Sequence, residues 1–111
     1  MYIINEHTSE ENTLMYIMEE HGISFCMLSF YEKEKHLMCL SNLNVAENYR
    51  EEGRGNDILG FAIKRAKSRG CEYLYLYTTD KNSWITEWYK RIGFVEYKCE
   101  VEECYMYLKL K

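Results

Sequence analysis

The sequence contains no proline, and it has no apolar run near the ~18 residues that a membrane-spanning helix needs. Its first residues, Met1 to Glu6, do not resemble a signal peptide. An excess of positive charge is also missing, because 14 basic residues face 18 acidic ones and leave a net charge of −4. We therefore expect no membrane association and no broad binding to nucleic acid. The absence of proline by itself names no function.

The cysteines are odd in number and form no CxxC pair. They are Cys26, Cys39, Cys71, Cys99 and Cys104. We interpret them as buried or idle thiols, which predicts a reducing, cytoplasmic environment. His36 and Cys39 are three residues apart in an alternating stretch, where such positions face opposite sides of a strand. No metal site is therefore predicted at this pair or elsewhere.

The composition predicts one folded domain over residues 1–111. Apolar residues make up 47% of the chain and charged residues 29%, which argues against disorder. A chain of this length holds one core, and no internal repeat or linker divides it. Tyrosine dominates the aromatic residues, with 11 against 4 Phe and 2 Trp. It suits half-buried strands and binding clefts alike.

The N-terminal half predicts strands. A short apolar strand is expected at Tyr2–Ile4, followed by a polar loop at His7–Asn12. Three bulky apolar stretches then predict an antiparallel meander. These stretches are Thr13–Glu19, Ile23–Tyr31 and His36–Val45, with a charged hairpin tip between the last two.

The apolar period then changes to a helical one over Asn56–Arg69, where basic residues crowd the end and Gly70 follows as a cap. The remaining stretches predict a strand at Glu72–Thr79, a helix at Ser83–Ile92, and a closing hairpin of Phe94–Lys98 and Cys104–Leu110. The fold class is thus α+β (mixed α/β). We expect a central, mostly antiparallel sheet with one parallel strand–helix–strand unit and two main helices.

The junction between the third strand of the meander and the first helix carries the chemical signal. Gly53 and Gly55 open a helix directly after a strand. Such a loop can turn its backbone N–H groups toward one point, where the helix N-terminus adds partial positive charge. The pattern predicts an anion cradle suited to phosphate. The dinucleotide fingerprint and the Walker loop are both excluded, because their further glycine or Gly-Lys-Ser/Thr is missing.

This junction resembles that of a known family. Arg50-Glu51-Glu52-Gly53-Arg54-Gly55 is similar to the R/Q-x-x-G-x-G/A loop of the GNAT superfamily of acetyl-CoA-dependent N-acyltransferases. The family's second signature, N-x-x-A-x-x-F/W-Y-x-K/R-x-G-F, resembles the stretch from Asn82 to Phe94. Both signatures occur in the family's order, and the resemblance covers about residues 13–110.

The resemblance implies an N-acetyltransferase that moves acetyl from acetyl-CoA to a primary amine by direct attack. The pyrophosphate of CoA is then expected on the glycine loop, and its pantetheine arm where Asn42–Val45 and Tyr75–Thr78 splay apart. An amide near Val45, aimed by a bulge, would hold the thioester oxygen. Tyr89 would protonate the departing thiolate, packing in the helix being its alternative role. The implied cofactor-binding residues are Leu43, Asn44, Val45, Arg50, Glu51, Glu52, Gly53, Arg54, Gly55, Asn56, Asn82 and Tyr89.

Several features depart from the family pattern. Glu51 and Glu52 stand where the family commonly has Gly and a basic residue, and their charges would repel pyrophosphate. The two helices that usually follow the family's first strand have no room, so the acceptor cleft should be open or closed by a second subunit. No general base is evident on the strand before the loop. Asn82 could cap the second helix instead of contacting CoA, and Trp84 and Trp88 are interpreted as core.

Two functions therefore remain from the sequence. The first is the enzyme, acting on a small-molecule or peptide amine. The alternative is a non-catalytic module that binds CoA or a partner protein, which Glu51, Glu52 and the absent base favour. The final hairpin, in which Tyr105 and Tyr107 alternate with Met106 and Leu108, is a candidate for pairing across a homodimer.

Overall fold

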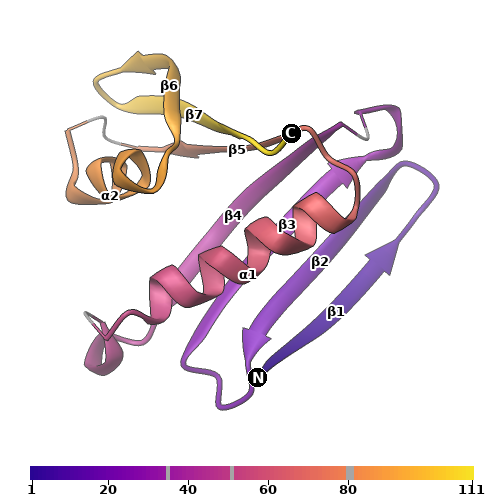
Figure 1. Cartoon of the computed structure of the whole chain (residues 1–111), viewed down its shortest axis with the longest axis horizontal. Coiled ribbons are helices and arrows are strands. Elements are labelled where there is room, and N and C mark those ends of the chain that lie inside the picture. Colours follow the sequence, from indigo (N-terminus) through magenta and orange to yellow (C-terminus); the bar gives the residue numbers. More distant parts are fainter. Residues whose placement is uncertain (35, 51, 80–81) are drawn as a thin grey trace.

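The computed structural model describes residues 1–34, 36–50, 52–79 and 82–111. Its core element is one seven-stranded sheet in the order β1-β2-β3-β4-β5-β7-β6 (Figure 1). The strands are β1 (Tyr2–Thr8), β2 (Asn12–Glu19), β3 (Ser24–Tyr31), β4 (Leu37–Val45), β5 (Tyr73–Thr78), β6 (Val95–Glu100) and β7 (Glu103–Lys109). The helices are α1 (Arg54–Ser68) and α2 (Trp84–Ile92), with short 3-10 turns at Glu32–Glu34 and Glu47–Tyr49. Within the described ranges, no helix is long and apolar enough to cross a membrane.

The sheet is antiparallel except at one pair, where β4 runs parallel to β5. This confirms the predicted mixed sheet with a single parallel strand–helix–strand unit, in which α1 forms the crossover. The helical span was predicted two residues late, because Arg54 and Gly55 already belong to α1. Gly70 follows the helix at φ +82°, which is the left-handed conformation that commonly ends a helix.

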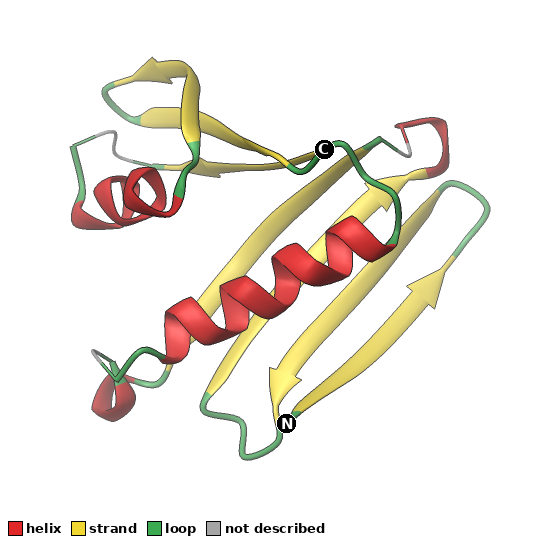
Figure 2. Ribbon diagram, in the orientation of Figure 1, coloured by secondary structure: helices red, strands yellow, loops and turns green. Residues whose placement is uncertain are grey.

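Both helices lie on the same face of the sheet (Figure 2). Side chains of β2–β5 alternate between this face and the other, so every second residue enters the core beneath the helices. The core includes Met15, Ile17, Leu28, Met38 and Leu74, all fully buried, and the α1 residues Ile58, Leu59, Ala62 and Ala66 pack on them. The alternation of Tyr73, Tyr75 and Tyr77 with Leu74 and Leu76 behaves as predicted, since only the leucines are buried.

The prediction for the N-terminus was wrong in one respect. β1 continues to Thr8 instead of ending at Ile4, and only residues 9–11 connect it to β2. The polar residues of β1 are held by pairing, because Glu6 lies opposite Met15 and Thr8 opposite Thr13. Glu6 also accepts a hydrogen bond from Arg69 at 2.6 Å. The meander therefore has four strands, and no helix separates the first two.

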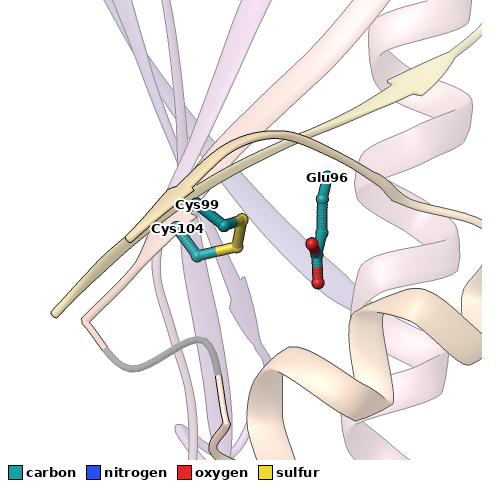
Figure 3. Close-up of side chains that lie close together, drawn as sticks. All are labelled: Glu96, Cys99 and Cys104. Carbon is teal, nitrogen blue, oxygen red and sulfur yellow. A yellow bond between two sulfur atoms is a disulfide. The ribbon is translucent and has the colours of Figure 1, made fainter. Parts of the chain in front are cut away.

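The prediction that all cysteines are free was also wrong. Cys99 and Cys104 lie directly opposite each other on β6 and β7 and form a disulfide (Figure 3). The pairing of the hairpin brings the two residues together, although they are only five positions apart in the sequence. Cys26 and Cys71 are buried free thiols and Cys39 is partly buried, as expected. In the sheet β7 is flanked by β5 and β6, so the free edge of the final hairpin belongs to β6.

Candidate active site

A cavity of about 640 Å³ opens where the end of β4, the start of α1 and one side of α2 meet. Residues 43–56 and residues 84–91, which are distant in the sequence, contribute the side chains and backbone that line it. The lining residues are Leu43, Asn44, Val45, Arg50, Gly53, Gly55, Asn56, Trp84, Ile85, Trp88 and Arg91.

The β4 wall of the cavity is a strand segment that has left its parallel partner. Pairing between β4 and β5 is confined to Leu37–Cys39 and Tyr73–Tyr75 in the described chain, so the two strands separate beyond these residues. A bulge lies at this end of β4, because two residues, Asn42 and Leu43, separate Ser41 from Asn44, whereas Cys26 alone separates their β3 partners Met27 and Phe25. Asn42 occupies the left-handed region at φ +52° within it.

After the bulge, the backbone N–H and C=O of Val45 face the gap between β4 and β5. The Ala46 N–H donates to the Ile23 carbonyl at 2.7 Å, so Ala46 points its amide toward β3. Successive residues of a strand point their backbone groups in opposite directions, so the N–H and C=O of Val45 point away from β3. The Val45 carbonyl accepts a hydrogen bond from Nε of Arg50 at 3.0 Å. This bond anchors Arg50 beside the cavity.

The glycine loop supplies the second wall. Gly53 has φ +81°, a left-handed conformation that residues with a Cβ rarely adopt. Its carbonyl accepts the N–H of Asp57 at 3.0 Å, which is the first hydrogen bond of α1. The amides of Arg54, Gly55 and Asn56 therefore lack partners within the helix, and no side chain caps them from Gly53. These donors and the helix dipole make this end of the cavity suited to an anion.

The α2 wall is aromatic. The indole N–H of Trp88 donates to Oδ1 of Asn56 at 3.0 Å, which ties α2 to the start of α1. A Cβ on Gly55 would lie 3.5 Å from the Trp88 ring, an ordinary contact distance, so the two helices lie about as close as an alanine there would allow. Trp84 is 72% exposed. Arg91 adds a positive charge to the cavity lining, in addition to that of Arg50. The interpretation of Trp84 as a core residue was wrong, because the amphipathic α2 turns Thr86 and Tyr89 inward instead. Trp88 is partly buried and packs against the core while it also lines the cavity.

Tyr89 lies behind this wall. Its side chain is 5% exposed, packs on the rings of Trp88 and Phe94, and lies near Cys26. Burial, with a smaller contribution from Cys26, raises the pKa of Tyr89 to about 12. The phenol is therefore protonated throughout the neutral range. Its hydroxyl has no hydrogen-bond partner in the described ranges.

Comparison with known proteins identifies the family. The model of the acetyltransferase (GNAT) family matches residues 2–94, which is most of the chain. The chain belongs to the GNAT acetyltransferase family. A search of curated proteins finds no match. As a member of this family the chain is an acetyltransferase-type enzyme that uses acetyl-CoA.

Solved structures share the GNAT fold at low sequence identity. A GNAT acetyltransferase from Elizabethkingia anophelis with acetyl-CoA bound has a TM-score of 0.75 at 16% identity, covering 98% of each chain. The ribosomal-protein-S18-alanine N-acetyltransferase of Escherichia coli has a TM-score of 0.74 at 18% identity and covers 93% of this chain and 72% of its own. A GNAT acetyltransferase from Staphylococcus aureus Mu50 has a TM-score of 0.73 at 20% identity, covering 92% and 70%. These likenesses show the fold.

The cavity gathers most, but not all, of the residues that the GNAT signatures predicted. Seven of them line it, from Leu43 to Asn56, whereas Glu52, Arg54, Asn82 and Tyr89 do not. Glu52 accepts a hydrogen bond from Nε of Arg54 at 3.2 Å, and the Arg54 guanidinium lies 5.0 Å from the centre of the Tyr49 ring. The expected repulsion from Glu52 is thus offset locally. Glu51 lies outside the described residues.

The role of helix cap belongs to Ser83, not to Asn82. The Ser83 hydroxyl accepts the N–H of Thr86 at 3.3 Å, and Asn82 precedes it as an exposed residue. Sequence reasoning missed Ile85 and Arg91 as cavity residues. The helical spacing could have found them, because positions 84, 88 and 91 share one face of a helix and position 85 lies three residues before 88.

No described residue that lines the cavity is a carboxylate or a histidine, so these lining residues offer no general base. Two groups of metal-ligand side chains lie elsewhere. In the first, Cys99 and Cys104 are bonded to each other near Glu96 (Figure 3), and Glu96 pairs with Lys90. In the second, Glu19 accepts the amides of His21 and Ile23 at 3.1 and 3.3 Å. Both groups are engaged with protein partners.

Proposed function

We propose that this chain transfers the acetyl group of acetyl-CoA to a primary amine by direct attack. The observation that carries the proposal is the cavity in which the unpaired amides at the start of α1 meet the separated segment of β4. An anion site at one end and a free backbone donor at the other match a ligand that carries a pyrophosphate and a thioester.

The pyrophosphate would lie against the amides of Arg54, Gly55 and Asn56. The helix dipole favours its negative charge there, and Arg50 and Arg91 add positive charge from two sides. The pantetheine arm would follow the β4 segment and contact Trp88 and Ile85, which give the cavity an apolar side. Leu43 and Val45 would contact it from the sheet.

The thioester oxygen would accept a hydrogen bond from the Val45 amide, which faces the gap. This bond strengthens as negative charge develops on the oxygen in the transition state. The nitrogen of the amine forms a bond to the carbonyl carbon, the C–S bond breaks, and the amine loses one proton to solvent. The CoA thiolate takes the proton of the Tyr89 hydroxyl, and the resulting phenolate takes a proton back from solvent.

The binding part of this proposal is tested by two matched glycine variants. Gly53 and Gly70 have φ +81° and +82°, and a Cβ on either would meet no atom within 4 Å. Changing either to alanine therefore strains the backbone alone, and should cost about 1 kcal/mol of unfolding free energy. We expect both variants to melt at similarly lowered temperatures, whereas only Gly53→Ala should lose affinity for acetyl-CoA, by roughly tenfold or more. Thermal melts with increasing acetyl-CoA measure both effects.

Equal affinity for acetyl-CoA in the two variants would contradict the placement of pyrophosphate on the glycine loop. A wild-type protein whose melting temperature does not respond to millimolar acetyl-CoA would contradict the whole site, because a ligand at about 100 times its Kd adds about 2.7 kcal/mol. A normal melting shift without thiol release from any amine would favour a module that binds CoA without turnover.

A further inference from the structure

The sheet face opposite α1 and α2 is exposed over the four strands β1–β4. Both helices lie on the other side (Figure 2), and the β1–β2 connection is too short to fold over this face. We call the side chains of β1–β4 that point away from α1 the open face. Its large members are Ile3, Tyr16, Met18, Phe25, Met27 and Tyr31.

These side chains form continuous rows across the strands. Ile3 lies opposite Met18, and Met18 lies opposite Phe25. The three side chains are 48%, 44% and 38% exposed, which is unusual for three adjacent large apolar groups. A second row beside it pairs Tyr16 with Met27. The open face is therefore a connected apolar patch and not a scatter of single residues.

The open face also lacks charge. Glu6 and Glu19 are the charged residues of β1–β4, and both point to the helix side, where Glu6 pairs with Arg69 of the α1 C-terminus. No Asp, Glu, Lys or Arg side chain of these four strands lies on the open face, in a chain of which 29% is charged. Depletion of charge with enrichment of Tyr, Phe and Met is the composition of an interface core.

The projected area of the open face is of the same order as a dimer contact. Four strands about 4.8 Å apart, each about eight residues long at ~3.3 Å per residue, cover roughly 500 Å² in projection. The accessible surface of protruding side chains is larger than this projection. A standard interface takes about 800 Å² from each partner, so the open face is of the size that a stable dimer uses.

We propose that the open face binds the open face of a second copy of this chain. Two chains of net charge −4 repel each other unless their acidic groups stay out of the contact, and the open face keeps them out. A partner chosen by charge would need opposite charges on the open face, but its strands place no carboxylate, lysine or arginine there, and His7 packs edge-on against Tyr16. A symmetric contact places the Ile3, Met18 and Phe25 rows of two sheets against each other, at the ~10 Å spacing of packed sheets.

Sedimentation velocity from 1 to 200 µM tests the proposal. The wild-type chain should sediment as a dimer at the upper concentrations. Met18→Lys and Phe25→Lys each place a charge in the centre of the contact, and each should weaken dimerisation by about 100-fold or more. Val101→Lys is the matched control, because Val101 is 65% exposed in the β6–β7 turn, away from the open face, and this variant should remain a dimer.

Methionine oxidation gives a second measurement on the unmodified chain. Met18 should react more slowly with peroxide at concentrations where the dimer forms, whereas Met1, which is 87% exposed, should react at a constant rate. A wild-type monomer at 200 µM would overturn the proposal and leave the open face to a different protein. A dimer that both lysine variants preserve would overturn it as well. The acetyl-CoA melting shift of each variant reports that it is folded, so failure here leaves the proposed function standing.

Discussion

Tyr89 shows how one residue can satisfy both packing and chemistry. It is almost fully buried and contacts two aromatic rings, yet its hydroxyl has no protein partner in the described ranges. We predict that Tyr89→Phe lowers kcat by about 100-fold and leaves the Kd for acetyl-CoA unchanged, because the substitution removes the proposed proton donor and keeps the ring that packs on Trp88. Steady-state kinetics and a melting titration measure the two quantities separately.

The matched control for this residue is Tyr2→Phe. Tyr2 also has a raised pKa, mainly from burial, and packs on Phe61 of α1. The Tyr2→Phe variant should leave kcat within about twofold of the wild type, since the Tyr2 hydroxyl has no part in the proposed reaction. If Tyr89→Phe turned over at the wild-type rate, Tyr89 would have no part in the reaction and its role would be packing alone.

At the scale of elements, the bulge in β4 decides where the strand directs its free backbone groups. Within the bulge Asn42 itself has a left-handed backbone conformation, which asparagine tolerates and β-branched residues do not. We predict that Asn42→Val lowers the unfolding free energy by about 2 kcal/mol, whereas Asn42→Gly changes it little. Urea unfolding measures both, with Ser29→Val on the regular neighbouring strand as control. An equal loss in the two valine variants would contradict a role for backbone conformation.

Most elements could be predicted from the sequence because their apolar period is local information. The strands around Thr13–Glu19 and Tyr73–Thr78 and the helix after Gly53 were found this way, within two or three residues of their ends. The second half of β1 could not be found, because its polar residues become a strand only by pairing with β2. The Cys99–Cys104 disulfide depends in the same way on hairpin register.

At the scale of the whole molecule, the site arises from two signatures that the chain brings together across the sheet. The glycine loop and the residues from Leu43 to Val45 were predicted from the family pattern, and the structure places them around one cavity. The orientation of α2 could not be predicted from the pattern alone. Whether Trp84 and Trp88 face the core or the cavity depends on which side of a short helix meets the sheet, and Thr86 and Tyr89 occupy that side.

Buried acidic protons should make the whole fold sensitive to alkali. Burial raises the pKa of Cys26 and of Tyr89 each to about 12, above their ordinary values of 9.0 and 10.0. Between those values and 12 the unfolded chain releases protons that the folded chain retains, so stability is full below about pH 9 and falls as pH rises. The loss should be roughly 1.4 kcal/mol per pH unit for each group. Urea unfolding between pH 8 and 11 measures it. Cys26→Ala should reduce the fall in unfolding free energy that begins near pH 9. Tyr89→Phe should reduce the fall that begins near pH 10. Unchanged slopes in both variants would mean that other groups govern the alkaline transition.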